Sequence, residues 1–188
     1  MSDTGSVSGS EEWMRRFHLG TGTVAGTGEL TVRRGPGILA GVVCALLRLP
    51  RTAEGVPITV VVRRRPAHHG PRDDGRAVVE HWTRRIGSHR LVTTQLRTGS
   101  HGWERHGPFV LHTRTVATPG EVVVTQDRAV LGVGPLSVRL PVWSAPRVWA
   151  RARAEPGEGA RFHLEVRVTL PVLGSLLSYS GHLDETPA

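Results

Sequence analysis

The sequence predicts a mainly β fold, an antiparallel curved sheet or β-barrel of about eight to nine strands with one short apolar helix. First, short segments rich in Val, Thr and Ile recur along the chain between turns that contain Gly and Pro. Second, apolar and polar residues alternate strictly from Phe162 to Leu170, which indicates one buried and one exposed face. Third, only residues 38–48 have the apolar character of a buried helix.

The first quarter of the chain is expected to form a helix, a strand and a second helix. Apolar residues at helical spacing predict a short helix at 11–18, and a Thr- and Val-rich strand follows at 23–33. Residues 35–37 (GPG) end this strand, and Pro50 ends the apolar helix at 38–48. Since that helix is apolar nearly all round, we expect it to be a plug or lid against the sheet, or to be covered by a partner.

The rest of the chain reads as strands and turns. The predicted strands are 58–64, 77–86, 90–97, 103–117, 121–126, 136–140, 147–154, 160–170 and 176–183. A polar loop is expected at 66–74, and 118–120 (TPG) is expected to be a hairpin turn. The strands at 147–154 and 160–170 are spaced as a hairpin.

The length of 188 residues predicts one domain, residues 11–188, behind a disordered Ser- and Gly-rich tail at 1–10. The single cysteine, Cys44, allows no intrachain disulfide and is interpreted as a small buried hydrophobic residue. The longest apolar segment, 38–47, is far shorter than the roughly 20 residues that span a bilayer. With no secretory signal at the start, these features predict a cytoplasmic protein without a membrane partner.

The net charge is +8, and the basic residues are all arginine, because the chain contains no lysine; asparagine is absent too. Schiff-base catalysis, a phosphate-loop lysine and Cys-His-Asn proteolysis are therefore excluded. Arginines occur on nearly every predicted strand among acidic residues, and aromatic residues that could stack on bases are few, so nucleic acid is not the expected partner. The one basic cluster, residues 63–65, is interpreted as a solvated strand edge.

The sequence does not match the familiar dinucleotide-binding, metal-binding and serine-hydrolase motifs. The glycine-rich segment 20–28 lacks the strand before it and the helix after it that a dinucleotide site needs, so its glycines are interpreted as close packing or a bulge. His68 and His69 are adjacent, and the segment 101–106 (HGWERH) has no helical His-Glu-x-x-His geometry. No Gly-x-Ser-x-Gly elbow is present. We therefore predict neither a metal nor a cofactor.

Four segments resemble, in this order, an uncharacterised bacterial domain family: 82–87 (WTRRIG), 104–108 (ERHGP), 140–146 (LPVWSAP) and 171–181 (PVLGSLLSYSG). The glycine-rich first strand and residues 34–37 (RGPG) fit the same pattern. Ile86 departs from it, because the family usually has an aromatic residue there. Members of that family occur alone or fused behind saccharopine-dehydrogenase-like or short-chain-dehydrogenase-like domains. The resemblance implies a fold and a dehydrogenase-like partner, and no established activity.

The candidate site begins with polar residues on an apolar strand face. One side of the strand at 77–86 carries Val78, Glu80, Trp82, Arg84 and Ile86. Its three apolar members predict that this side faces inward and takes Glu80 and Arg84 with it. Glu104 is the expected partner of Arg84, and Tyr179 is the only phenol in the chain.

This group has two interpretations. In the first, it is a buried ion pair that fixes strand register. In the second, it is the polar end of an apolar cavity, where Glu104 or Glu80 moves a proton and Arg84 and Tyr179 hold a developing oxyanion. The predicted apolar walls are Trp82, Trp103, Trp143 and Trp149.

The leading prediction is a β-barrel that binds a small hydrophobic molecule and acts as a cofactor-independent cyclase or isomerase of bacterial secondary metabolism. The alternative is a non-catalytic interaction domain that partners a dehydrogenase-like protein. A homodimer is compatible with either. The sequence leaves open whether the protein is an enzyme.

Overall fold

The fold is described from a computed structural model over residues 9–46, 49–67, 77–106, 109–133, 136–157 and 159–187. Helix α1 spans Gly9–Leu19 and helix α2 spans Ile38–Leu46. Residues 9 and 10 of the predicted tail therefore lie in α1, while residues 1–8 and most of the predicted loop at 66–74, with His68 and His69, lie outside the described residues.

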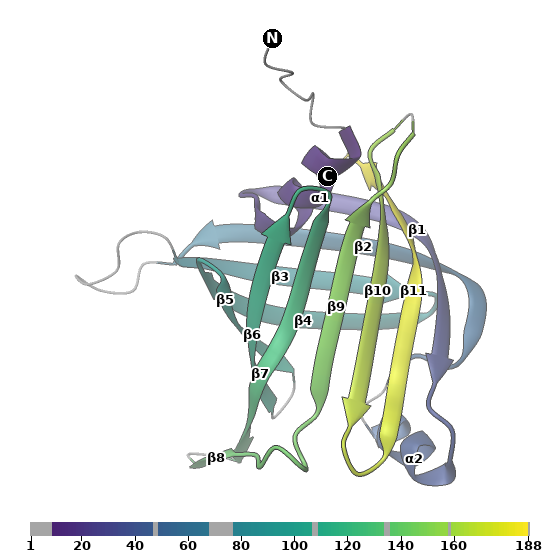
Figure 1. The fold of residues 1–188 in the computed structure, drawn as a ribbon, viewed down its shortest axis with the longest axis vertical. Helices are drawn as coiled ribbons and strands as arrows, with labels where there is room; N and C mark the ends of the chain where they lie inside the picture. Colours follow the sequence, from purple (N-terminus) through teal and green to yellow (C-terminus); the bar gives the residue numbers. More distant parts are fainter. Residues whose placement is uncertain are drawn as a thin grey trace.

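The mainly β architecture is confirmed: ten antiparallel strands close into a barrel, and a short eleventh strand, β8, pairs with the end of β7 (Figure 1). The strands of the described residues are β1 (Thr23–Arg34), β2 (Ala53–Pro66), β3 (Ala77–Ile86), β4 (His89–Thr98), β5 (His101–His106), β6 (Phe109–Thr118), β7 (Glu121–Val133), β8 (Leu136–Arg139), β9 (Arg147–Ala154), β10 (Arg161–Leu170) and β11 (Gly174–Thr186). Neighbours around the barrel follow chain order except that β7 pairs with β9 and that β11 pairs with β1.

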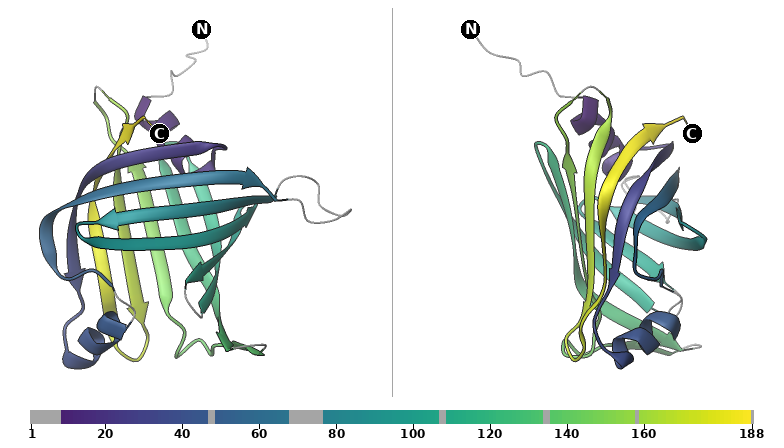
Figure 2. Two further views of the ribbon diagram at one scale, coloured as in Figure 1. Left: turned by 180° about the vertical axis from the view of Figure 1, so that it is seen from behind. Right: turned by 90° about the vertical axis from the view of Figure 1, so that its right-hand side faces the viewer.

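The strand count exceeds the predicted eight to nine. The segment predicted as one strand at 103–117 is two strands, β5 and β6, because the chain reverses between His106 and Phe109, which pair with each other. The predicted hairpin of β9 and β10 and the hairpin turn between Thr118 and Glu121 are confirmed. Figure 2 shows β2, β3 and β4 crossing the strands β7, β9, β10 and β11 at a steep angle, so the barrel is flattened into two faces.

Close approach of β1 and β11 explains Gly28 in the glycine-rich segment 20–28. A Cβ atom on Gly28 would lie 1.8 Å from the carbonyl oxygen of His182, and one on Gly181 would lie 2.0 Å from that of Glu29. Neither distance leaves room for a side chain. The interpretation of these glycines as close packing is therefore confirmed at Gly28.

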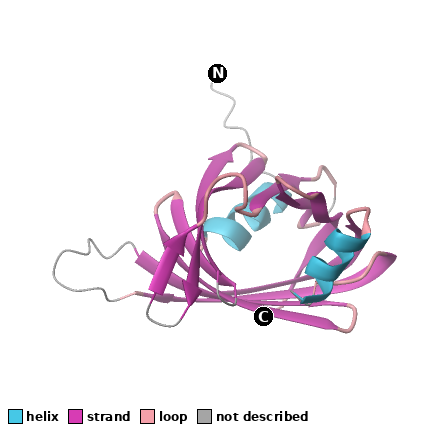
Figure 3. Cartoon of the chain, turned by 90° about the horizontal axis from the view of Figure 1, so that it is seen from below, coloured by secondary structure: helices cyan, strands magenta, loops and turns pink. Residues whose placement is uncertain are grey.

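The two helices lie at opposite ends of the barrel (Figure 1). Seen from below, α1 lies inside the outline of the strands and α2 lies at its edge (Figure 3). Helix α1 inserts Trp13, Met14 and Phe17 into the main core, where all three are buried. Helix α2 packs only one side against β11, where Cys44 is buried as predicted and its Sγ donates a hydrogen bond to the Leu176 carbonyl at 3.2 Å. Helix α1 is thus the plug of the barrel, while α2, predicted to be a plug or lid against the sheet, packs against the sheet at the opposite end.

The opposite side of α2 is exposed. Ile38 is 89% exposed, and Leu39 and Val42 are exposed too. The helix is apolar nearly all round, yet it lies at the barrel end, where only its Ala40 and Cys44 side meets the sheet. None of the described helices has the length and hydropathy needed to cross a bilayer.

Candidate functional site

Arg84 and Glu104 lie inside the barrel, on β3 and β5. Nη1 of Arg84 lies 3.7 Å from Oε1 of Glu104 and donates a hydrogen bond to Oγ1 of Thr93 at 2.9 Å. The guanidinium also lies over the ring of Trp82, 4.7 Å from its centroid, in cation–π geometry. The predicted pairing of Arg84 with Glu104 is confirmed, and a carboxylate, a guanidinium and an aromatic ring meet at one place.

Tyr179 faces the same interior from β11. Its cross-strand partners are Val32 and Val166, which both face inward. Burial raises the pKa of the Tyr179 phenol, the charge of Arg84 lowers it, and the charge of Glu104 raises it again, with a net increase. The phenol is therefore protonated at neutral pH and can donate a hydrogen bond.

Arg84 and Glu104 are not completely buried. The side chains of Arg84 and Glu104 point inward, yet they keep 15% and 20% of their accessible surface. A cavity of about 950 Å³, open to solvent, lies at the rim of the barrel between α2 and the β3–β4 turn. Its lining includes Leu91, the cross-strand partner of Arg84, and Val32, the partner of Tyr179. The cavity therefore reaches the cross-strand partners of Arg84 and Tyr179. Arg84, Glu104 and Tyr179 are not among its described lining residues.

Glu80 belongs to a different arrangement. Its carboxylate is 1% exposed and pairs with Nε of Arg64 at 2.9 Å and with Nε of Arg97 at 2.8 Å. Nε1 of Trp82 donates a hydrogen bond to its second oxygen at 2.9 Å. Burial alone would raise the pKa of Glu80, but the charge of Arg64 and the hydrogen bonds from Arg97 and Trp82 hold it below its usual value.

The two arginines that pair with Glu80 also hold the C-terminal end of α1. Arg64 donates a hydrogen bond to the Phe17 carbonyl, and Arg97 donates to the carbonyls of Leu19 and Gly20 at 3.4 and 3.3 Å. These carbonyls have no partner within the helix, so the arginines satisfy them. The prediction that residues 63–65 form a solvated edge was wrong for Arg64, whose side chain follows Val60 and Val62 on the inward face of β2.

Of the four tryptophans predicted as apolar walls, Trp82 alone borders the interior. Trp103 lies on the outer face of β5, against His112. Trp149 lies on the outer face of β9, where the guanidinium of Arg167 is 5.2 Å from its ring centroid. Trp143 is 67% exposed, between β8 and β9. Apolar residues of the strands line the interior in their place.

His18 is an interior residue that the sequence analysis did not single out. It lies on the last turn of α1, its Nδ1 is 3.0 Å from the Met14 carbonyl, and its ring centroid is 6.4 Å from that of Trp82. Desolvation by burial lowers the pKa of His18 from 6.5 to about 4, against the hydrogen bond to Met14. The helical spacing of Met14 and His18, four residues apart, was the available signal.

Because His18 is neutral in the folded protein, acid should destabilise the fold through this residue. Its contribution is complete above the unfolded pKa of 6.5 and is lost as the pH falls toward the folded value of about 4. Between pH 7 and pH 5 the loss should be about 2 kcal/mol. We therefore expect the free energy of unfolding, measured with urea at pH 7 and at pH 5, to fall less in His18→Gln than in wild type, by about 2 kcal/mol. Glutamine keeps a hydrogen-bond donor at this position. An equal fall in the free energy of unfolding in both proteins would show that His18 is not the source of this acid sensitivity.

Comparison with known proteins gives a family and no activity. A search of the curated proteins finds no match. A family model described as "Domain of unknown function (DUF4166)" matches residues 10–183, which include nearly all of α1, strands β1 to β10, most of β11 and the interior polar group. The chain belongs to this family of domains of unknown function.

Proposed function

We propose that the barrel binds a small, largely hydrophobic molecule with a polar end and acts on it as a cofactor-independent cyclase or isomerase. The observation that carries the proposal is the accessible pair of Arg84 and Glu104 inside the barrel, beside a cavity of about 950 Å³. Drug-sized ligands occupy cavities of roughly 300–1,000 Å³ with few polar groups, so the dimensions suit such a molecule.

The proposed chemistry assigns a role to each polar residue. Glu104 removes a proton from the carbon next to a substrate carbonyl, and Arg84 and Tyr179 donate hydrogen bonds to the oxygen on which negative charge develops. Return of the proton at another carbon completes an isomerisation. Trp82 fixes the guanidinium by the stacking described above. We leave Glu80 out of the reaction, because both of its oxygens are already paired.

A comparison with the Glu80 cluster supports a binding role for the Arg84–Glu104 pair. The Glu80 cluster has the properties of a structural pair: complete burial, three partners and contact with a helix end. The Arg84–Glu104 pair is longer, at 3.7 Å, and partly accessible. A pair of this kind can exchange one partner for a ligand at lower cost, because its charges are already partly hydrated.

Substitution of Arg84 should reduce ligand affinity without unfolding the protein. With 1-anilinonaphthalene-8-sulfonate as a fluorescent probe that has an apolar body and an anionic end, Arg84→Met should bind about 10- to 100-fold more weakly than wild type, the cost of one charge-assisted hydrogen bond. The matched control is Arg85→Met, which removes the neighbouring exposed arginine on the outer face of β3 and should leave affinity unchanged. Equal affinities in wild type and Arg84→Met would refute the binding site, and an unfolded Arg84→Met protein would support the structural interpretation.

Exposed apolar residues at one end of the barrel support a second candidate, a non-catalytic domain that partners a dehydrogenase-like protein. They lie on α2 (Ile38, Leu39), between β8 and β9 (Val142, Trp143) and in the β10–β11 turn (Val172). Figure 1 shows these three elements at the same end. Native mass spectrometry of freshly purified protein separates the candidates, because a bound small molecule supports the first and a bound protein supports the second.

A further inference from the structure

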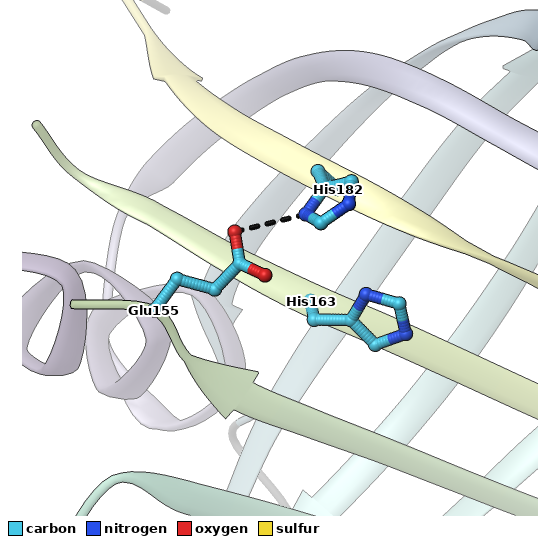
Figure 4. A group of neighbouring side chains, drawn as sticks. All are labelled: Glu155, His163 and His182. Carbon is cyan, nitrogen blue, oxygen red and sulfur yellow. Dashed lines mark hydrogen bonds and ion pairs between the residues drawn. The ribbon is translucent and has the colours of Figure 1, made fainter. Parts of the chain in front are cut away.

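Two histidines face each other on the outer surface of the barrel. His163 on β10 and His182 on β11 are direct partners in the antiparallel register, and their ring centroids are 5.0 Å apart (Figure 4). Both residues alternate with inward-facing neighbours, Phe162 and Leu183, so their rings point away from the core. The ladder is regular at this point, and its bulge lies several residues away, between Val168 and Thr169.

A carboxylate completes the group. Glu155 follows β9 directly, and its backbone N–H donates a hydrogen bond to the Arg161 carbonyl at 3.2 Å, which fixes the start of the turn. Its Oε2 lies 2.8 Å from Nδ1 of His182. Ligand atoms of Glu155, His163 and His182 all lie within 4.8 Å of one another. The β9–β10 hairpin and strand β11 thus bring two imidazoles and one carboxylate together (Figure 4).

These are the ligand types that zinc uses in sites with three protein ligands. The ligand atoms of a tetrahedral zinc ion lie about 3.3 Å apart, given Zn–N and Zn–O bonds of about 2.0–2.2 Å. Small side-chain rotations bring a group within 4.8 Å to that spacing, while the paired strands hold the backbone in place. Zinc would replace the contact between Glu155 and His182.

Acidic side chains offset the nearby positive charges, with Glu121 shared between Arg151 and Arg153. Arg161 pairs with Asp184 at 2.6 Å, and Arg153, the cross-strand partner of His163, lies 3.8 Å from Glu121. Glu29 on β1 is the cross-strand partner of His182 and adds a further carboxylate beside the group. The local charge therefore favours a cation.

We propose that Glu155, His163 and His182 bind one zinc ion on the outer face of the barrel, with the fourth position open to water. The ion joins the end of β9 to β10 and β11. This site lies on the opposite face of the sheet from Arg84, Glu104 and Tyr179, so it is independent of the proposed ligand-binding function. The sequence-based prediction of no metal considered only histidines close in sequence. It could not include His163 and His182, which strand pairing brings together.

Isothermal titration of the full chain with zinc tests the proposal. Wild type should bind one zinc ion per chain, and His163→Ala or His182→Ala should weaken binding by at least about tenfold. Glu155→Gln, which keeps the shape of the side chain, should weaken it as well. His81→Ala removes an outward-facing histidine on β3 and should leave this binding unchanged. Absence of saturable binding by wild type, or equal binding by the His163 and His182 variants, overturns the proposal.

Thermal unfolding gives a second measurement that adventitious binding to other histidines would not reproduce. Zinc at about 100 times its dissociation constant should raise the Tm of wild type by roughly 5–10 °C, and EDTA should reverse the shift. The His163→Ala protein should unfold in EDTA close to wild type, because the side chain is on the surface, and zinc should not raise its Tm. An equal rise in this variant would contradict the assignment of His163 as a ligand.

Discussion

Glu80→Gln is expected to lower the free energy of unfolding by about 3–5 kcal/mol, the cost of removing one partner from a buried ion pair. The substitution leaves Arg64 and Arg97 without a counter-charge inside the barrel, although both still contact carbonyls of α1. It also weakens the acceptor for Trp82. Because these arginines hold the end of α1, we expect the helix to loosen together with the core around Phe17.

Urea unfolding at neutral pH measures this effect, and Glu165→Gln is the matched control. Glu165 pairs with Arg167 on the outer face of β10, at 2.8 Å, and such exposed pairs contribute less than about 1 kcal/mol. The effect of Glu80 also has a pH signature. Since the folded pKa of Glu80 is lowered, its stabilisation is present above the unfolded pKa and is lost as the pH falls through the folded value. A loss in Glu80→Gln no larger than in Glu165→Gln would show that the cluster is not structural.

Local alternation was sufficient to predict much of the interior. It gave the inward faces of β3 and β10, and with them the partnership of Arg84 and Glu104. The same rule applied to β2 would have placed Arg64 beside Val60 and Val62 and identified it as buried. The solvated interpretation of residues 63–65 failed because it treated three neighbouring arginines as one surface, although successive residues of a strand point to opposite faces.

Other features depend on which strands become neighbours, and alternation does not carry that information. Glu80 takes its arginine partners from β2 and β4. Trp103 and Trp149 point outward because of the register of their own strands, and Trp143 lies exposed between β8 and β9. His163 and His182 are neighbours only because β10 pairs with β11 in one particular register. A shift of one residue would move one ring to the interior. Topology also decides which helix enters the barrel. Helix α2 is the more apolar of the two, yet it lies at the rim and α1 enters the core.

Gly28→Ala is expected to destabilise the protein by at least about 3 kcal/mol, because the added methyl group meets backbone atoms that cannot rotate away. The new Cβ would lie 1.8 Å from the carbonyl oxygen of His182 and 2.8 Å from its carbonyl carbon. Relief requires β1 and β11 to separate, and this pair closes the barrel. Tyr179 lies on the same ladder, opposite Val32, so the separation should also disturb the interior site.

Gly41→Ala separates this steric effect from the general cost of changing glycine. Gly41 lies within α2, and a Cβ added there would meet no heavy atom within 4 Å. Alanine is the better helix former by about 1 kcal/mol, so Gly41→Ala should be neutral or slightly stabilising. The two variants make the same chemical change with opposite expected signs, measured by urea unfolding. Should Gly28→Ala unfold at the same urea concentration as wild type, the strands must tolerate a wider spacing, and the glycines of β1 would then need an explanation other than close packing.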